Sequence, residues 1–153
     1  MAAIVISDAS PLIGLARVNG IGWLQVLCQE VVIPAVVADE VLTGVFPLEA
    51  GWLRIATTIP AAPSLPDLDE EEAAGIRLAL AAPGPAMLLI DERAGRAVAQ
   101  ELGLTIAGTA AVIGMARQRG LTSSARAVFS ELHASDFRIA PAMIQTVLDR
   151  CGA

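Results

Sequence analysis

Four carboxylates in this chain are spaced so that they could hold a hard cation. Asp8 and Asp91 each follow a short apolar run that is typical of a buried strand, whereas Glu40 and Glu72 lie in stretches with helical character. In a fold that alternates strands and helices, strand ends and helix starts meet at one edge of the sheet. Carboxylates gathered at that edge repel each other and favour a cation that prefers oxygen ligands.

Asp8 and Glu40 also have plainer structural explanations. Asp8 could be a turn residue whose side chain accepts nearby backbone N–H groups. Glu40 borders the apolar stripe of its expected helix, where a carboxylate is unfavourable unless it is paired or liganded. It could instead extend into water, as we expect for Asp39. We favour a functional interpretation of both acids.

Glu72 and Asp91 could serve as helix caps. Asp69 and Glu72 have the spacing of a capping box with an acidic N-cap, and acids suit the start of a helix. Glu70 and Glu71 leave open which acid points inward. Asp91 could be the N-cap of the helix that follows it. The ordered set of acids is therefore more specific than any one member.

Three more residues are candidates for a supporting role. Ser10 precedes Pro11 and is expected to be the N-cap of a helix, although its hydroxyl could also reach a metal-bound water. Arg93 and Arg96 lie three residues apart in the first turns of an expected helix. They could bind phosphate or form part of a solvated charged surface.

The composition limits the classes of function. The net charge is −6, which argues against non-specific coating of nucleic acid. The longest uncharged stretch, residues 102–116, is too short to span a membrane, and the N-terminus lacks the pattern of a signal peptide. Cys28 and Cys151 form no paired motif and suit a reducing cytoplasm, and the lone His133 argues against zinc. All ten basic residues are Arg.

The apolar pattern predicts an α/β fold in one domain, residues 1–153. Strands are expected over residues 4–6, 31–33, 53–55, 87–90 and 104–106. Helices are expected over residues 10–17, 21–29, 34–43, 69–81, 92–102, 109–119, 123–133 and 141–150. This alternation indicates a parallel sheet that is covered on both faces.

The order of the acids resembles the PIN domain, the fold of the VapC-type toxin ribonucleases. Residues 5–13 (Val-Ile-Ser-Asp-Ala-Ser-Pro-Leu-Ile) resemble its first strand and turn, and residues 31–34 running into Glu40 resemble its second strand and acid. Glu72 and Asp91, which are 19 residues apart, match the third and fourth acids. Residues 89–96 and 108–109 are most similar to a PIN-like branch of uncharacterised prokaryotic proteins. The resemblance extends to about Leu148.

The resemblance implies a three-layer α/β/α sandwich with a mostly parallel sheet of four to five strands. It implies a metal-dependent endoribonuclease that cleaves RNA, is the toxin of a toxin–antitoxin pair, forms a homodimer and is bound by an antitoxin. The residues implied to be catalytic and to hold Mg²⁺ or Mn²⁺ are Asp8, Glu40, Glu72 and Asp91. Those implied to contact substrate are Ser10, Arg93, Arg96 and Thr109.

The chain departs from the usual PIN pattern at two positions. Leu89 occupies a place that usually holds Ser or Thr, and Glu72 stands where Asp is usual. Thr109 is a candidate to supply the missing hydroxyl. A catalytically weak or inactive PIN-like module that binds nucleic acid or has a regulatory role is therefore the alternative.

Other phosphate chemistries fit less well. Response-regulator receivers and haloacid-dehalogenase-type phosphatases also place an Asp after the first strand, but both use a Lys, which this chain lacks. Asp8-Ala9-Ser10 also lacks the second Asp of the phosphatase motif. The chain contains neither a GxGxxG nor a GxxxxGK[ST] loop, so dinucleotide and P-loop binding are unsupported.

Overall fold

Five short strands form one sheet in which each neighbouring pair is parallel. The computed structural model describes residues 4–41 and 51–153. The sheet order is β3-β2-β1-β4-β5. The strands are β1 (Ile4–Ser7), β2 (Glu30–Pro34), β3 (Leu53–Ala56), β4 (Ala86–Leu89) and β5 (Thr105–Ala107). The expected α/β class is confirmed, with a sheet that is parallel throughout.

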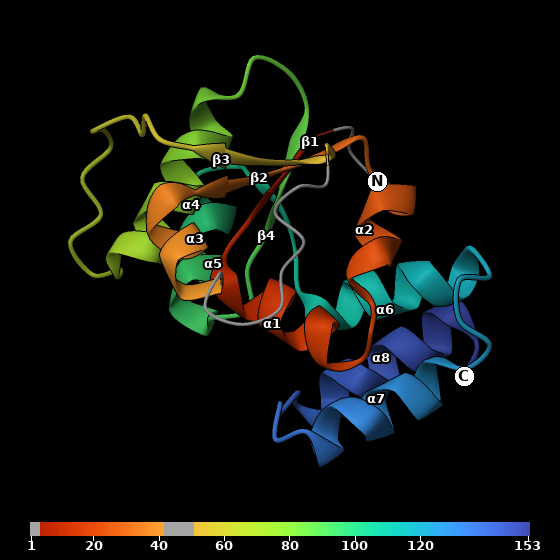
Figure 1. Ribbon diagram of the computed structural model, residues 1–153. Coiled ribbons are helices and arrows are strands. Elements are labelled where there is room, and N and C mark those ends of the chain that lie inside the picture. Colours follow the sequence, from red (N-terminus) through yellow and green to blue (C-terminus); the bar gives the residue numbers. More distant parts are fainter. Residues whose placement is uncertain (1–3, 42–50) are drawn as a thin grey trace.

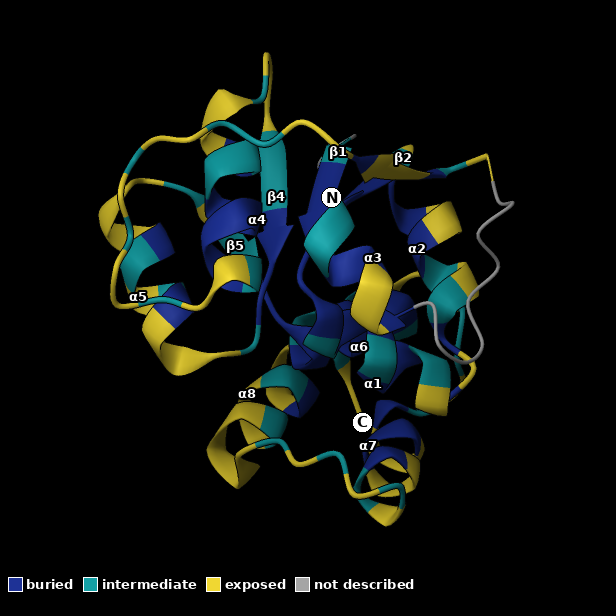
Figure 2. Ribbon diagram, turned by 60° about the vertical axis from the view of Figure 1, so that its left-hand side comes forward, coloured by how far each residue is buried: buried dark blue, intermediate teal, exposed yellow. Residues whose placement is uncertain are grey.

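Apolar side chains leave both faces of this sheet and enter two separate cores. Val5, Val31 and Ile33 belong to the larger core, whereas the alternate residues Ile6 and Val32 belong to the smaller one. Residues that alternate along a strand point to opposite faces, so nearly continuous apolar runs are needed when both faces are covered. In Figure 2, most of β1 and the carboxyl end of β4 are coloured as buried, whereas the edge strands β3 and β5 contain exposed residues.

Helices cover the two faces unequally (Figure 1). The smaller core is closed by α4 (Glu70–Ala81) and α5 (Arg93–Glu101). The larger core is closed by α1 (Ala9–Arg17), α2 (Ile21–Leu27), α3 (Ala35–Val41) and α6 (Thr109–Gln118). Two further helices, α7 (Ala125–Ala134) and α8 (Pro141–Cys151), pack against α6 on the outside. The result is a three-layer sandwich extended by a helical pair.

The expected elements are all found, with differences at a few boundaries. Pro34 ends β2, paired in register with Ala56, rather than opening α3. Ser10 is not an N-cap, because α1 begins one residue earlier and Asp8 occupies the N-cap position. Glu92 rather than Asp91 precedes α5. Residues 42–43 of the expected third helix lie outside the described residues.

The uncharged stretch 102–116 begins just after α5 and includes β5 and most of α6, and its apolar residues belong largely to the cores. Among the described residues, no helix has the length and apolar character needed to cross a membrane.

The order of the strands creates a crevice between β1 and β4. The chain adds β2 and β3 on one side of β1, and then returns to add β4 and β5 on the other side. Ligands bind at such a switch point, beyond the carboxyl ends of the strands. The Asp8 N–H donates to the Leu89 carbonyl at 3.0 Å, so the two strands are still paired where Asp8 begins. Asp8 and Asp91 therefore follow adjacent strand ends.

Candidate active site

Asp8 is a buried carboxylate with incomplete hydrogen bonding. It is 6% exposed, and its Oδ1 has no hydrogen-bond partner. Burial raises its pKa from 3.8 to about 6, and repulsion by Asp69, Glu40 and Asp91 adds to the effect, while a hydrogen bond from the Ala9 N–H opposes it. The turn explanation is therefore incomplete, because one oxygen still faces the site without a donor.

Asp91 is held by donors from two helices. The Thr109 N–H donates to Oδ1 at 2.8 Å, and the Thr109 hydroxyl donates to Oδ2 at 2.7 Å. The Ser10 hydroxyl donates to the same Oδ2 at 2.9 Å. Asp91 thus caps the start of α6 rather than α5. Leu89 has no hydroxyl, but Asp91 Oδ2 accepts hydrogen bonds from the hydroxyls of Ser10 and Thr109, the second of which the sequence suggested.

A close approach at Gly108 makes this arrangement possible. A Cβ at Gly108 would lie 2.7 Å from Asp91 Oδ1 and 3.1 Å from Arg96 Nη1. Arg96 is half-buried, and its Nη1 donates to the Ile90 carbonyl at 2.9 Å, so it is more than a solvated surface charge. Arg93 is exposed.

Glu72 takes part in a helix cap through its backbone and also has a buried side chain. Its N–H donates to the N-cap side chain of Asp69 at 2.8 Å, which confirms the capping interaction. Its side chain is nevertheless 7% exposed, and Oε2 has no hydrogen-bond partner. Burial, a side-chain hydrogen bond with Asp69 and repulsion by Asp69, Asp8 and Glu92 raise its pKa to about 7. A Cβ at Gly95 of α5 would collide with this carboxylate, so Glu72 occupies space that only a glycine leaves open.

Glu40 lies on the exposed side of α3 and interacts with a residue that the sequence did not single out. Burial, followed by a hydrogen bond with Glu40 and repulsion from Glu40, Asp8 and Asp69, raises the pKa of Glu71 to about 7. Glu71 and Asp69 therefore join the site. The run of acids at the start of α4 was the available signal, but it does not show which members face Asp8.

Seven carboxylates either raise the pKa of another member of the group by repulsion or have their own pKa raised in this way. We call them the acidic centre, and they are Asp8, Glu40, Asp69, Glu71, Glu72, Asp91 and Glu92. Within the described ranges, one ion pair is found, between Arg54 and Glu30 at 3.2 Å, and it involves none of these acids. Hydrogen bonds stabilise Asp91 in particular, whereas Asp8 and Glu72 each keep one buried oxygen without a partner.

The acidic centre has the donor chemistry that a divalent cation needs, but its side chains are not arranged around a single ion. Its donors are all oxygens, and Asp8 Oδ1 and Glu72 Oε2 are buried without partners, which matches the preference of Mg²⁺ and Mn²⁺. However, no three of the described His, Cys, Asp or Glu residues are placed to hold one metal ion together. Binding would therefore require side-chain adjustment.

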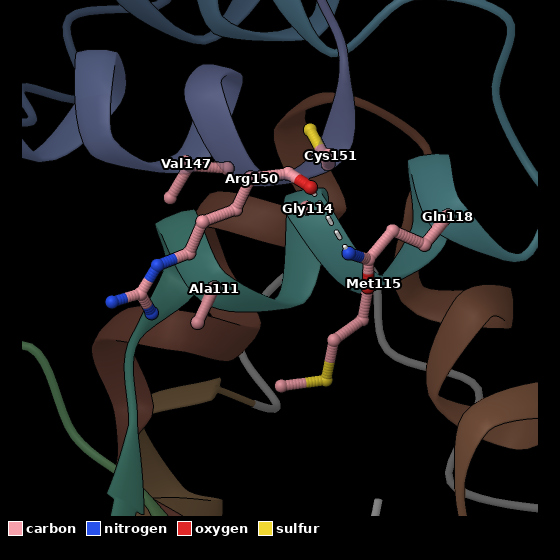
Figure 3. Close-up of a pocket in the computed structure, with 7 residues that line it drawn as sticks. All are labelled: Ala111, Gly114, Met115, Gln118, Val147, Arg150 and Cys151. Atoms are coloured by element: carbon pink, nitrogen blue, oxygen red, sulfur yellow. Dashed lines mark hydrogen bonds between the residues drawn. The ribbon is translucent and has the colours of Figure 1, made fainter.

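Two pockets differ in their relation to the acidic centre. The first, which we call the Asp91 pocket, has a volume of about 300 Å³ and lies between Ser10, Asp91 and Glu92 and residues 137–140. The second, shown in Figure 3, also measures about 300 Å³ and lies between α6 and α8, where Gln118 Nε2 donates to the Arg150 carbonyl at 3.4 Å. It contains no carboxylate, so the Asp91 pocket is the one relevant to the candidate site.

Comparison with known families agrees with this geometry. Residues 4–153 match a family model described as a PIN domain, so the chain belongs to the PIN-domain family. PIN domains are generally nucleases that use divalent metal ions, and the family therefore supports a nuclease-like activity on nucleic acid. No curated protein and no solved structure was found to match the chain.

The hydrogen bonds on Asp91 predict a specific effect of Thr109. Thr109→Val removes the hydroxyl donor from a charged acceptor and should lower the free energy of unfolding by about 1.5–3 kcal/mol. Thr109→Ser, which keeps the hydroxyl, should lower it less. The difference between the two variants should shrink in an Asp91→Asn background, as measured by urea unfolding in a double-mutant cycle. An undiminished difference would show that the Thr109 hydroxyl does not act through Asp91.

The raised pKa values predict that the protein without bound cations loses stability as the pH rises. In the folded state the pKa changes from 3.8 to about 6 for Asp8 and from 4.5 to about 7 for Glu71 and Glu72. The folded state therefore binds more protons than the unfolded chain between about pH 4 and pH 7, and the free energy of unfolding falls across this interval.

The measurement is urea unfolding between pH 4 and pH 8 in the presence of a chelator. Asp8→Asn should raise the free energy of unfolding at pH 7 by about 2 kcal/mol and flatten the profile. Glu131→Gln, at an exposed position of α7, is the matched control and should leave the profile unchanged. An identical profile for Asp8→Asn and the wild type would mean that the Asp8 charge is not opposed to folding.

Proposed function

We propose that this protein is a metal-dependent endoribonuclease whose metal ligands and catalytic residues are Asp8, Glu40, Glu72 and Asp91. The observation that carries the proposal is the pair of buried carboxylate oxygens, on Asp8 and Glu72, that have no hydrogen-bond partner beside Asp91 at the switch point of the sheet. Buried charges of one sign persist in a fold when a ligand of opposite charge compensates them. Membership of the PIN-domain family supports a nuclease as the class of enzyme.

The residues of the chain divide the work of phosphodiester hydrolysis, in which water adds across one P–O bond. A divalent cation held by the four acids supplies Lewis-acid activation and neutralises negative charge. Ser10 and Thr109 each donate a hydroxyl hydrogen bond to Asp91 and so fix the orientation of its carboxylate. Thr109 is fully buried, so its proposed role is to position Asp91 rather than to touch the substrate, whereas the partly buried Ser10 is proposed to do both. Arg96 and the exposed Arg93 lie on the helix that follows Asp91 and provide positive charge for a phosphate.

The proposed biological role follows from the resemblance to toxin ribonucleases. We propose that RNA is the substrate, that the enzyme forms a homodimer in the cytoplasm, and that an antitoxin inhibits it. Asp8 Oδ1 and Glu72 Oε2 are buried without hydrogen-bond partners, so an Arg or Lys of an antitoxin would find acceptors there. The two free cysteines agree with a reducing compartment.

One observation favours a second candidate, a PIN-like module that binds nucleic acid without turnover. No three acids of the described chain are placed to hold a metal, and both oxygens of Asp91 already accept hydrogen bonds. A binding module would need no divalent ion. The two candidates are therefore separated by metal dependence.

The first test of the proposed function is cleavage of pooled cellular RNA with Mg²⁺ or Mn²⁺, read by mapping of the new ends. The wild type should produce discrete ends that disappear with a chelator. Asp8→Asn and Asp91→Asn should each lower the cleavage rate by at least about 100-fold, since each removes a charged group from the catalytic site. Glu131→Gln should cleave as the wild type does. Equal profiles from the wild type and Asp8→Asn, with both proteins folded, would rule out the nuclease.

The second test is stabilisation by the ion itself. At 100 times its dissociation constant, a cation that binds only the folded state adds about 2.7 kcal/mol to the free energy of unfolding. We expect Mn²⁺ to raise the thermal midpoint of the wild type at pH 7.5 and to have little effect on Asp8→Asn. A midpoint that is indifferent to Mn²⁺ would favour the binding module.

A further inference from the structure

The Asp91 pocket combines two surfaces of different chemistry. Its volume of about 300 Å³ is at the lower end of the range for sites that hold one small ligand. Its lining includes acids and a hydroxyl from the strand ends and the start of α1, together with an apolar and aromatic set that contains one cation and comes largely from residues 137–143, which we call the apolar wall. The residues that the argument uses are Ser10, Asp91, Phe137, Arg138, Ile139 and Met143.

The apolar wall is held in place and still accessible. The Phe137 ring lies against α1, where a Cβ at Gly14 would be 2.8 Å from it, so the ring has little room to move in that direction. Phe137 and Ile139 are half-buried, and Met143 is 40% exposed. A flat apolar ligand in the pocket would therefore cover surface that water now reaches.

Arg138 adds a positive charge at this wall. Its side chain is exposed, and the one ion pair of the described residues, Arg54 with Glu30, does not involve it. The N-terminus of α8 begins at Pro141 on the same wall, and its positive end also favours negative charge. Arg138 and the start of α8 therefore offer positive charge to an anion at the apolar wall of the same pocket.

We propose that the Asp91 pocket binds one unpaired nucleotide of an RNA strand, with the base against Phe137, Ile139 and Met143 and a phosphate at Arg138. This inference rests on the proposed function and places the next phosphodiester at the acidic centre. Aromatic and apolar side chains bind the faces of unstacked bases, and Arg binds the backbone. A base in a duplex cannot enter such a pocket without first unpairing, so the pocket requires an unpaired nucleotide.

The test measures binding of a short, fluorescently labelled single-stranded RNA of mixed sequence to the full chain carrying Asp8→Asn, so that cleavage does not interfere. Adding Arg138→Gln should raise the dissociation constant about fivefold at low salt. It should also lower the slope of log affinity against log salt by about 0.7, because one phosphate contact is lost. Met143→Ala, which removes apolar surface from the proposed contact with the base, should raise the dissociation constant about fivefold.

Arg119→Gln is the matched control, because Arg119 is an exposed arginine at the opposite end of α6 from Thr109. It should leave both the dissociation constant and the salt slope close to the parent values. The thermal midpoint of each variant checks folding. A duplex of the same sequence should bind more weakly than the single strand.

The outcomes separate this inference from the proposed function. If the wild type cleaves RNA while Arg138→Gln and Met143→Ala change neither binding in the Asp8→Asn background nor cleavage in the wild-type background, the pocket assignment is wrong and the nuclease stands. If RNA binds without any cleavage by the wild type, but both variants weaken binding, the pocket assignment holds and the nuclease fails. Absent binding of single-stranded RNA, or equal binding of the duplex, would overturn the pocket assignment.

Discussion

Burial of several carboxylates that also repel one another is the constraint on which the candidate site depends. Asp8 and Glu72 are each less than a tenth exposed, and each keeps one oxygen without a hydrogen-bond partner. The order of the strands and the start of α4 bring these charges together, so the repulsion is built into the topology. The two apolar cores supply the free energy that holds the charges at this edge, because burial of apolar surface is the dominant favourable contribution to folding.

Two glycines determine how closely the surrounding elements approach the acids. Gly95 lets α5 pack against the Glu72 side chain and Ile90, and Gly108 lets the start of α6 reach the Asp91 carboxylate. A Cβ at Gly95 would collide with Glu72 and Ile90, and a Cβ at Gly108 would collide with Asp91. A larger residue would push a carboxylate away from its place, so these glycines belong to the architecture of the site as much as the acids do.

The sequence predicted the elements well because their signals are local. Apolar runs and helix breakers located the strands and helices, and the alternation of strand and helix gave the parallel sheet. The surroundings of Asp91 were harder to predict, since Thr109 is 18 residues away and Ser10 is 81 residues away. The position of Ser10 before Pro11 suggested a helix cap, whereas its hydroxyl donates to Asp91, which follows the neighbouring strand β4. Likewise, the direction in which Glu71 points depends on how α3 and α4 pack, which no local pattern encodes.

Asp8 and Asp91 differ in a way that bears on evolution. Asp91 accepts hydrogen bonds from α1 and α6 and so helps to join distant parts of the chain, whatever its role in chemistry. Asp8 has the opposite character, because its charge is buried with an unsatisfied oxygen. A lineage that lost activity would still be selected to keep Asp91 for folding, but would gain stability by replacing Asp8 with a neutral residue. Under the proposed function, an aspartate at the position of Asp8 is therefore a better marker of a working enzyme than an aspartate at the position of Asp91.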